Sequence, residues 1–375
     1  MQFTFDRDAM IKEISIAQEV ISIKSPVSII SNILLIAENN ALVIKATDST
    51  INFATYIPVD IQEEGRTTVY CDKFMNILSS LPSGEVEFIQ EDIEITIKPI
   101  AKRFKAKLKS QTDDKFPEKN LSDNIPFFEI PSSDFKEMIR ETIFATSTDT
   151  SRMFMSGCYL VKEDDNLTLV ATDGRRLSCD IKKGLNIPDI TPANIPTKIL
   201  NLVLKHAPSE GNIQLAIVES AIFVKFGTVT FQSSLVGLPY PNYKRVIPEG
   251  LTKSFQVNKK DLDEALKRTA VMIDKKVYRM IMKITSGELE LICPESETGE
   301  SNEIIPCRYE GNPLVLALNY NYLVEPLKVI DSEDVLFEFD YGEANEGEEV
   351  RISKPIVMRG SDNSDYFHVV MPMNY

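Results

Sequence analysis

The chain has 375 residues, of which 43% are hydrophobic and 26% are charged, and this is the composition of a folded protein of several domains. Its five cysteines are scattered and form no Cys-x-x-Cys pair, so we expect neither a disulfide framework nor a zinc site, and a reducing cytoplasm fits. The formal net charge of −15 argues against a surface that is basic throughout, as tight phosphate binding would require.

The first third of the chain alternates between predicted strands and amphipathic helices. Residues 2–5 predict a strand, and apolar residues at helical spacing predict a helix over 10–20. A second helix is predicted over 72–81, with counterparts at 196–204 and 319–327. The polar stretch 109–124 is interpreted as a linker. The first ten residues carry neither the basic nor the apolar region of a secretory signal, which favours a cytoplasmic protein.

Two phrases recur three times in the same order, about 125 residues apart. One is a short strand followed by a helix, which begins at Phe3, Phe128 and Phe255, with Ser133 and Asn258 where a helix N-cap is expected. The other is a strand that runs into a turn: LVIKATD at 42–48, LTLVATD at 167–173 and LELICPE at 289–295. The repeats predict three similar domains, 1–125, 126–250 and 251–375.

The later part of the chain adds two segments without a regular pattern. Residues 237–252 are rich in proline and glycine and are interpreted as a second linker. Residues 343–349, EANEGEE, predict an acidic loop, and 366–371 predict a final strand. Basic residues gather in and after the helix of the third repeat. Such a cluster is equally consistent with a solvated helix face and with a binding surface.

The sequence gives little support for catalysis. The two histidines, His206 and His368, lie far from any nucleophile motif, and phosphate-binding glycine motifs are absent. A carboxylate recurs in the second phrase, so a metal-dependent hydrolase that uses Asp48, Asp173 and Glu295 is an alternative hypothesis. The simpler interpretation is an acidic side chain that closes a turn after a strand. A monomeric peptide-binding scaffold is a further alternative.

Three segments resemble motifs of one family. Residues 171–178, ATDGRRLS, are similar to the ATDGHRLA-type segment of the bacterial sliding clamp, the beta subunit of DNA polymerase III. Residues 241–248, PNYKRVIP, resemble its FPDYRRVLP-type segment, and 369–375, VVMPMNY, resemble its closing VVMPMRL-type segment. The resemblance covers the whole chain. Two departures stand out: Arg175 replaces the usual histidine, and the chain ends in Asn374-Tyr375 instead of Arg-Leu.

The resemblance implies a non-catalytic processivity factor with an α+β fold and no cofactor or metal. Each domain would carry an antiparallel sheet outside and two helices that face a central channel. Two chains would close head to tail into a ring around duplex DNA, with Phe104 and Ala106 of one chain against Val271 and Met272 of the other. The implied partners are the replicative polymerase, a clamp loader and other proteins that carry a clamp-binding motif, and no membrane is implied.

The resemblance also implies two sets of binding residues. Weak and non-specific DNA contacts are expected from Lys24, Arg152, Lys136, Arg140, Lys198, Lys259, Lys260 and Lys267. A peptide pocket is expected between the second and third domains, with Leu177, Val246, Val370 and Met371 as its apolar floor and Arg176 and Arg245 at its rim. Its full set is Met155, Thr172, Gly174, Arg175, Arg176, Leu177, Pro241, Arg245, Val246, Val370, Met371, Pro372 and Met373.

Overall fold

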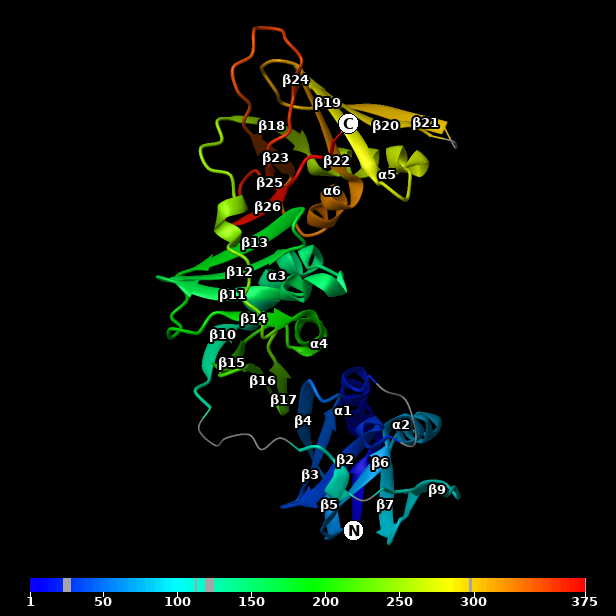
Figure 1. Ribbon diagram of the computed structural model, residues 1–375. Helices are drawn as coiled ribbons and strands as arrows, with labels where there is room; N and C mark the ends of the chain where they lie inside the picture. The colour runs from blue at the N-terminus through cyan, green and yellow to red at the C-terminus, as the bar shows by residue number, and fades with distance from the viewer. Residues whose placement is uncertain (23–27, 112, 119–124, 297–298, 375) are drawn as a thin grey trace. The chain divides into compact units, whose positions relative to one another are not determined.

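The computed structural model describes residues 1–22, 28–111, 113–118, 125–296 and 299–374 (Figure 1). The chain forms two compact units. The first unit consists of Met1–Ser133 with Lys198–Leu235, and the second of Asp134–Thr197 with Val236–Tyr375. Each unit contains one eight-stranded and one five-stranded sheet. The middle third of the sequence therefore supplies strands to the large sheets of both units.

In the first unit all described strand pairs are antiparallel. The five-stranded sheet has the order β5-β1-β7-β8-β9, and the eight-stranded sheet has the order β10-β15-β16-β17-β4-β3-β2-β6. The strands are β1 (Gln2–Asp6), β2 (Asn32–Glu38), β3 (Ala41–Thr47), β4 (Ile51–Pro58), β5 (Asp60–Glu63), β6 (Gly65–Tyr70), β7 (Glu85–Glu91), β8 (Glu94–Pro99), β9 (Ala106–Lys109), β10 (Phe128–Pro131), β15 (Asn212–Val218), β16 (Ala221–Phe226) and β17 (Val229–Ser234). The helices are α1 (Arg7–Val20), α2 (Cys71–Ser80) and α4 (Thr197–His206), with short 3-10 turns η1 (Ile29–Ser31) and η2 (Asp113–Lys115).

In the second unit one short pair, β22 with β24, is parallel. The eight-stranded sheet has the order β14-β11-β12-β13-β26-β25-β23-β18, and the five-stranded sheet has the order β21-β20-β19-β22-β24. The strands are β11 (Gly157–Glu163), β12 (Asn166–Thr172), β13 (Arg176–Lys183), β14 (Ala193–Pro196), β18 (Lys253–Asn258), β19 (Arg279–Thr285), β20 (Glu288–Ser296), β21 (Gly299–Pro306), β22 (Leu314–Asn319), β23 (Asp334–Phe339), β24 (Val350–Arg351), β25 (Ile356–Gly360) and β26 (Tyr366–Val370). The helices are α3 (Ser132–Thr142), α5 (Lys259–Thr269) and α6 (Tyr320–Leu327), with 3-10 turns η3 (Ile143–Ala145), η4 (Thr150–Met155), η5 (Tyr243–Val246) and η6 (Ala270–Met272).

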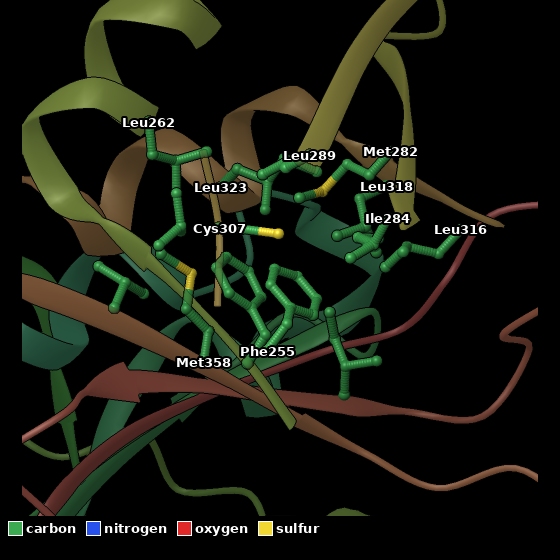
Figure 2. Packing of buried hydrophobic residues seen from close by; sticks show 14 of the residues in the cluster. Phe255, Leu262, Met282, Ile284, Leu289, Cys307, Leu316, Leu318, Leu323 and Met358 are labelled. Atoms are coloured by element: carbon green, nitrogen blue, oxygen red, sulfur yellow. The ribbon is translucent and has the colours of Figure 1, made fainter. Parts of the chain in front are cut away.

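The first repeated phrase builds equivalent cores. Phe3 on β1 is fully buried and stacks on Phe88 of β7, with ring centroids 4.7 Å apart. Phe255 on β18 stacks in the same manner on Phe337 of β23, at 4.6 Å. Figure 2 shows Phe255 among residues of α5, β19 and α6, including Leu262, Met282 and Leu323. Alternation along the strand places these rings inward, so the shared phrase produces a shared packing arrangement.

The expected helices are present, with small differences at their ends. Asn258 caps α5 and accepts hydrogen bonds from the backbone N–H groups of Lys260 and Asp261, as predicted. Ser133 is not the cap of α3, because that helix already begins at Ser132. The helix expected over 196–204 is α4, which continues two residues further and ends at His206. Residues 343–349 contain no helix or strand.

The third copy of the second phrase differs from the other two. Pro294 and Glu295 do not form a turn but lie within β20, which continues to Ser296 before its partner β21 begins. The pairing register with β21 shifts between Cys293 and Ser296, and such an irregularity admits a proline that cannot donate a ladder hydrogen bond. The prediction of a third turn here was therefore wrong.

No helix among the described residues has the length and apolar character needed to cross a bilayer.

Candidate functional site

The turn between β12 and β13 is held by its own side chains. The Asp173 Oδ1 atom accepts hydrogen bonds from the backbone N–H groups of Arg175 (2.9 Å) and Arg176 (3.2 Å). The Thr172 hydroxyl donates to the Arg176 carbonyl (2.6 Å) and accepts from the Gly174 N–H (3.0 Å). Gly174 has φ +88°, and a Cβ atom there would lie 3.0 Å from Nη1 of Arg152, so both conformation and space favour glycine.

The first unit contains the same turn between β3 and β4. Asp48 Oδ1 accepts from the N–H groups of Thr50 (2.9 Å) and Ile51 (2.7 Å), and the Thr47 hydroxyl donates to the Ile51 carbonyl (2.8 Å). Asp48 and Asp173 thus close turns, which confirms the simpler interpretation of the recurring carboxylate. Since the turn hydrogen bonds use both carboxylates and Glu295 lies within a strand, the geometry gives the hydrolase hypothesis no support.

The second oxygen of Asp48 holds a lysine. Asp48 Oδ2 lies 2.5 Å from Lys198 Nζ and accepts a hydrogen bond from the Ser22 hydroxyl at 3.1 Å. Burial alone would raise the pKa of this carboxyl group, but the hydrogen bonds from Lys198 and from the N–H groups of Ile51 and Thr50 outweigh it and lower the pKa to about 2. Lys198, expected to contact DNA, is therefore engaged within the first unit.

In the second unit, β13 pairs with β26, and the register assigns each side chain to a face. Leu177 lies opposite Val369, and Arg176 lies opposite Val370. Leu177 and Val369 belong to a buried cluster with Tyr243, whereas Val370 belongs to the core that contains Phe255. Figure 1 shows η5 on one side of this sheet, the side of Leu177 and Val369, and helices α3 and α6 on the other side. We call the side with Leu177 and Val369 the outer face.

The segment 237–252 is not a free linker. The ring of Tyr240 stacks on Tyr159 of β11 with centroids 4.7 Å apart, and Tyr243 meets the same ring edge-on at 6.3 Å. This aromatic packing fixes η5 against the outer face. Val246 in η5 is 47% exposed, and Met371, directly after β26, is 40% exposed. Exposed apolar residues gathered over a rigid sheet are typical of a binding surface.

The C-terminal segment is docked by its backbone. The N–H of Met371 donates to the Arg175 carbonyl (3.0 Å), and the N–H of Met373 donates to the Ala317 carbonyl on β22 (2.7 Å). Pro372 and Met373 are half-buried. The segment therefore extends from the turn of β13 to the smaller sheet of the same unit. Tyr375 lies outside the described residues.

Several residues expected in the peptide pocket meet on the outer face. Arg175 and Met371 are exposed at the paired ends of β13 and β26, and Arg245 and Val246 are exposed in η5, whose Tyr243 shares a buried cluster with Leu177 and Val369. We call these four residues the outer patch. Pro241 lies between the two tyrosines that fix η5, and the methyl group of Met155 lies 3.7 Å from where a Cβ of Gly174 would be. Thr172 and Gly174 shape the turn that presents Arg175.

Two expected positions are wrong. Val370 is fully buried in the inner core, so it cannot line a surface on the outer face. Alternation along the strand points its side chain to the other face from Val369 and Met371. Arg176 is only 9% exposed and does not lie at a rim. Sequence reasoning missed Val369, which occupies the position expected for Val370. The alternating pattern of 369–371 was the available signal, but the pairing with Leu177 came only from the structure.

Arg176 instead connects three elements on the inner face. Its guanidinium binds Asp173 Oδ2 (3.1 Å), the carboxylate of Glu325 on α6 and the carbonyl of Phe144 (2.6 Å). Its central carbon also lies 4.5 Å from the ring centroid of Tyr322. A buried guanidinium with this many partners fixes the geometry of its surroundings.

Next to Arg176 lies a buried polar layer. The Ser178 hydroxyl donates to the Glu141 carbonyl (2.5 Å), and the carboxyl groups of Glu141 and Asp180 lie together in the interior. Burial and the nearby charge of Asp180 raise the pKa of Glu141 to about 9, and burial also raises the pKa of Asp180. Burial, together with the charge of Arg176, lowers the pKa of His368 to about 3.

The basic residues expected to contact DNA fall into different environments. Lys259 donates to the Ile330 carbonyl, Lys267 lies 2.5 Å from Asp263, and Arg152 Nη1 donates to the Asp173 carbonyl at 3.2 Å. Lys136 also interacts with another group of the protein. Lys24 lies outside the described residues. Within the described part of the chain, exposed cations of this set without an ion pair are Arg140 on α3 and Lys260 on α5.

The residues expected at a chain-to-chain contact lie near sheet edges. In the described structure β9, with Ala106, pairs only with β8 and ends the five-stranded sheet of the first unit. Phe104, just before it, is 43% exposed. Val271 and Met272 lie in η6, and Val271 is 76% exposed. The strand β21 forms the corresponding open edge of the second unit and exposes 56% of Ile304.

A cavity of about 800 Å³ lies elsewhere in the second unit. The residues that form it include Lys253, Cys307, Arg308, Tyr309 and Tyr341. None of the residues expected to bind a peptide contributes to it.

Comparisons with known proteins agree along the whole sequence. Family models for the N-terminal, central and C-terminal domains of the DNA polymerase III beta subunit match residues 1–121, 129–242 and 244–374. The beta sliding clamp of Treponema pallidum is 38% identical over 378 residues, covering 100% of this chain and 99% of the relative. The beta sliding clamp of Pseudomonas aeruginosa is 28% identical and covers all of both chains.

Solved structures show the same fold. The crystal structure of the DNA polymerase III subunit beta from Pseudomonas aeruginosa superimposes with a TM-score of 0.92 at 26% identity, and 100% of each chain is covered. The fold is thus the three-domain α+β clamp fold with antiparallel sheets. The chain belongs to the family of bacterial beta sliding clamps, the non-catalytic processivity subunits of DNA polymerase III.

Proposed function

We propose that this clamp tethers the polymerase and other partners through a short extended peptide that lies on the outer patch. The observation that carries the proposal is the convergence of the β13 turn, η5 and the C-terminal segment on one face, where Val246 and Met371 stay exposed over buried Leu177. A peptide with a glutamine and one or two large apolar side chains suits this surface. Burial of two such side chains contributes about 3–6 kcal/mol before ordering costs, which corresponds to micromolar binding.

Removal of Met371–Tyr375 tests this proposal. The truncation deletes the exposed Met371 and both backbone contacts of the terminal segment but leaves β26 intact. Calorimetric titration with such a peptide should show loss of binding, while Tyr56→Ala, which removes an exposed aromatic side chain of the first unit, should leave the affinity unchanged. Unchanged affinity of the truncated protein would refute the assignment of the peptide to the outer patch.

We further propose that two copies close head to tail into a ring around duplex DNA, built from three domains at 1–125, 126–250 and 251–375. The open edges of β9 and β21 support this, because a strand edge with exposed apolar neighbours favours pairing with another chain. Phe104 and Ala106 of one copy would then meet Val271 and Met272 of the other.

The double variant Val271→Glu and Met272→Glu should be monomeric, because it brings unpaired charge into the contact. Leu238→Glu, which adds a charge at a position that is 48% exposed elsewhere in the second unit, should remain dimeric and serves as the control. Molar mass from light scattering distinguishes the outcomes, and a dimeric double variant would contradict the assigned contact.

For DNA, we propose weak contacts from exposed cations, among them Arg140 and Lys260, with the closed ring providing retention. The net charge of −15 makes tight binding of open duplex unfavourable. With a clamp loader, the protein should be retained on nicked circular DNA and released when the circle is cut. Salt-sensitive, tight binding to short linear duplex would instead indicate a conventional DNA-binding protein.

A further inference from the structure

The cavity of about 800 Å³ in the second unit lies beside the last strand of the larger sheet. In the described structure β18 pairs with β23 on one side, and on its other side only Gln256 is paired, with Arg308. The Gln256 N–H donates to the Arg308 carbonyl (3.0 Å), and the Arg308 N–H donates to the Gln256 carbonyl (2.7 Å). The part of β18 that precedes Gln256 is therefore an open sheet edge.

Alternation along β18 directs the backbone groups of Ser254 to this open edge. In an antiparallel ladder, successive residues point their N–H and C=O groups to opposite sides of the strand. Because Gln256 turns these groups toward Arg308, Ser254, two residues earlier, turns its own groups the same way. Ser254 is exposed and lines the cavity, and no strand of the described structure pairs with it on this side. A backbone donor and acceptor thus face an open space.

Another wall of the cavity is the loop at residues 309–312, which its own contacts hold in place. The Tyr309 hydroxyl donates to the Asn312 carbonyl (2.7 Å), and Asn312 Nδ2 donates to the Asn345 carbonyl (2.6 Å). Gly311 packs closely on Tyr309, since a Cβ atom there would lie 2.7 Å from the tyrosine Oη. The space between this loop and β18 is therefore bounded by fixed elements on both sides.

The two cations of the cavity already have partners. Lys253 Nζ lies 3.9 Å from Asp340 Oδ1 and 4.1 Å from the centroid of the Tyr341 ring. Arg308 Nη1 lies 3.5 Å from Asp334 Oδ2. Lys253 and Tyr341 also line a second cavity, of about 500 Å³, which adjoins the first. The positive charge at both cavities is therefore balanced by acidic groups of the protein itself.

Two carboxylates at these cavities are not balanced. Glu310 lines the first cavity and Glu343 lines the second, and both are exposed. Among the described residues, neither has a partner in an ion pair. Glu343 also begins the acidic stretch 343–349, which contains three further glutamates. The open edge of β18 thus faces a space with excess negative charge, and this favours a cationic ligand.

We propose that this cavity is a second docking site, where an extended, lysine- or arginine-bearing segment of a partner protein adds a strand to the edge of β18. In strand addition, main-chain hydrogen bonds provide affinity and alternate side chains provide specificity. Ser254 would pair with the main chain of the segment, and the cations of the segment would meet Glu310 and Glu343. The site shares no residue with the outer patch, so this inference does not depend on the peptide binding proposed above.

Three blocked hexapeptides test the inference. The first alternates lysine with valine, and the second has glutamate in place of each lysine. The third is the lysine peptide with N-methyl groups on its two central residues, which prevents hydrogen bonding along both edges of an extended chain. Fluorescence anisotropy of labelled peptides with the full-length protein at low salt should show saturable binding of the first peptide. The other two should bind about tenfold more weakly or not at all.

Ser254→Pro removes the backbone donor from the open edge. The N–H of Ser254 points away from β23, so the sheet keeps its ladder, and proline is tolerated at such an edge. The variant should bind the lysine peptide about tenfold more weakly. Ser254→Ala keeps the N–H and is the matched control, which should bind as the wild type does. The N-methylated peptide makes the same test without any change in the protein.

Glu310→Gln combined with Glu343→Gln tests the role of charge. This double variant should bind the lysine peptide about three- to tenfold more weakly than the wild type at low salt. Glu38→Gln combined with Glu219→Gln removes the same charge from exposed positions of the first unit and should leave the affinity unchanged. Equal losses in the two double variants would mean that only the net charge of the protein attracts the peptide, and this would overturn the inference.

Other outcomes would also overturn it. These are no saturable binding of the lysine peptide, equal binding of the glutamate peptide, and binding that N-methylation does not weaken. Displacement of the lysine peptide by one with a glutamine and two leucines would place it on the outer patch instead, and displacement by short duplex DNA would indicate a nucleic-acid site. If the peptide with glutamine and leucines fails to bind while the lysine peptide binds, the proposed function is refuted and this inference stands.

Discussion

The turns at 47–51 in the first unit and 172–176 in the second have the same hydrogen bonds but different attachments. In both, a threonine hydroxyl and an aspartate Oδ1 close the turn. In each turn the second carboxylate oxygen, Oδ2, can therefore bind a cation. In the first unit it holds Lys198, and in the second it holds Arg176, whose guanidinium continues to Glu325 and Phe144.

This difference separates what a repeat determines from what tertiary packing adds. Local sequence fixes the turn twice, because the same donors and acceptors stand at the same spacing. The partner of the remaining oxygen comes from a distant segment in each case. Lys198 attaches α4 to the first turn, while the guanidinium of Arg176 attaches α6 and η3 to the second. Lys198 also donates to the Val20 carbonyl at 2.6 Å, so each turn is tied to distant segments, but the cation at the second turn is the more deeply buried of the two.

The largest contrast is expected when each cation is removed. Arg176→Met should destabilise the second unit by about 3–5 kcal/mol, because it leaves partly buried acidic groups without their partner. Lys198→Met, the matched change, should cost less, since the Lys198 side chain is 37% exposed. Hydrogen exchange of peptides from β12–β13 and from β3–β4 measures the two effects separately. Equal losses would mean that the deeper burial of Arg176 adds no stability.

The second contrast is the opposite pH response of two buried carboxyl groups. Glu141 in the second unit has its pKa raised to about 9, so the folded protein keeps a proton that the unfolded chain loses above its ordinary value of 4.5. The stability of this unit should fall as pH rises from about 4.5 to 9. Glu141→Gln should then stabilise it by about 2 kcal/mol at pH 8 and by little at pH 4. Urea unfolding at the two pH values measures this, and a gain that is independent of pH would contradict the raised pKa.

Asp48 in the first unit should respond in the other direction. Its pKa of about 2 lies below the ordinary 3.8, so its contribution to stability is complete above about pH 4 and is lost as pH falls through 2. Asp48→Asn keeps an oxygen for the turn but loses the charge that binds Lys198. It should cost about 2 kcal/mol at pH 7. In the wild-type protein, acidification should reduce hydrogen-exchange protection in β3–β4, and the variant should not show this loss. If the variant loses protection to the same extent, groups other than Asp48 cause the acid response.

The smallest contrast concerns the third residue of each turn. Ser49 has φ +79° and Gly174 has φ +88°, a region that costs a side-chain-bearing residue about 1 kcal/mol. Ser49→Gly should stabilise the first unit by up to about 1 kcal/mol, and Gly174→Ala should destabilise the second by about 1–2 kcal/mol because its Cβ would also crowd Arg152. Shifts of the same sign in thermal unfolding would contradict this account.

Much of the fold could be predicted because it depends on local or repeated patterns. Alternation at Phe3 and Phe255, the cap at Asn258 and the turns at Asp48 and Asp173 all follow from a few neighbouring residues. The prediction of a third turn was wrong because proline usually favours turns, whereas here Pro294 lies within β20 at a shift in the pairing register with β21.

The site was predicted less completely because it depends on pairing between distant segments. Sequence similarity assigned Arg176 and Val370 to the binding surface, but the antiparallel register of β13 with β26 turns both inward. The same register brings Val369 to Leu177 on the outer face. A strand has two faces, and one residue of offset exchanges them, so a motif alone could not decide which side chains are presented.

The central place of β26 also affects how the protein is made. This strand comes from residues 366–370, yet it lies between β13 and β25 in the larger sheet of the second unit. Residues 366–370 must therefore be synthesised before that sheet can close, while every described strand of the first unit has been synthesised by residue 234. During synthesis the first unit can complete its sheets while β13 still waits with an unpaired edge, a state that favours chaperone binding.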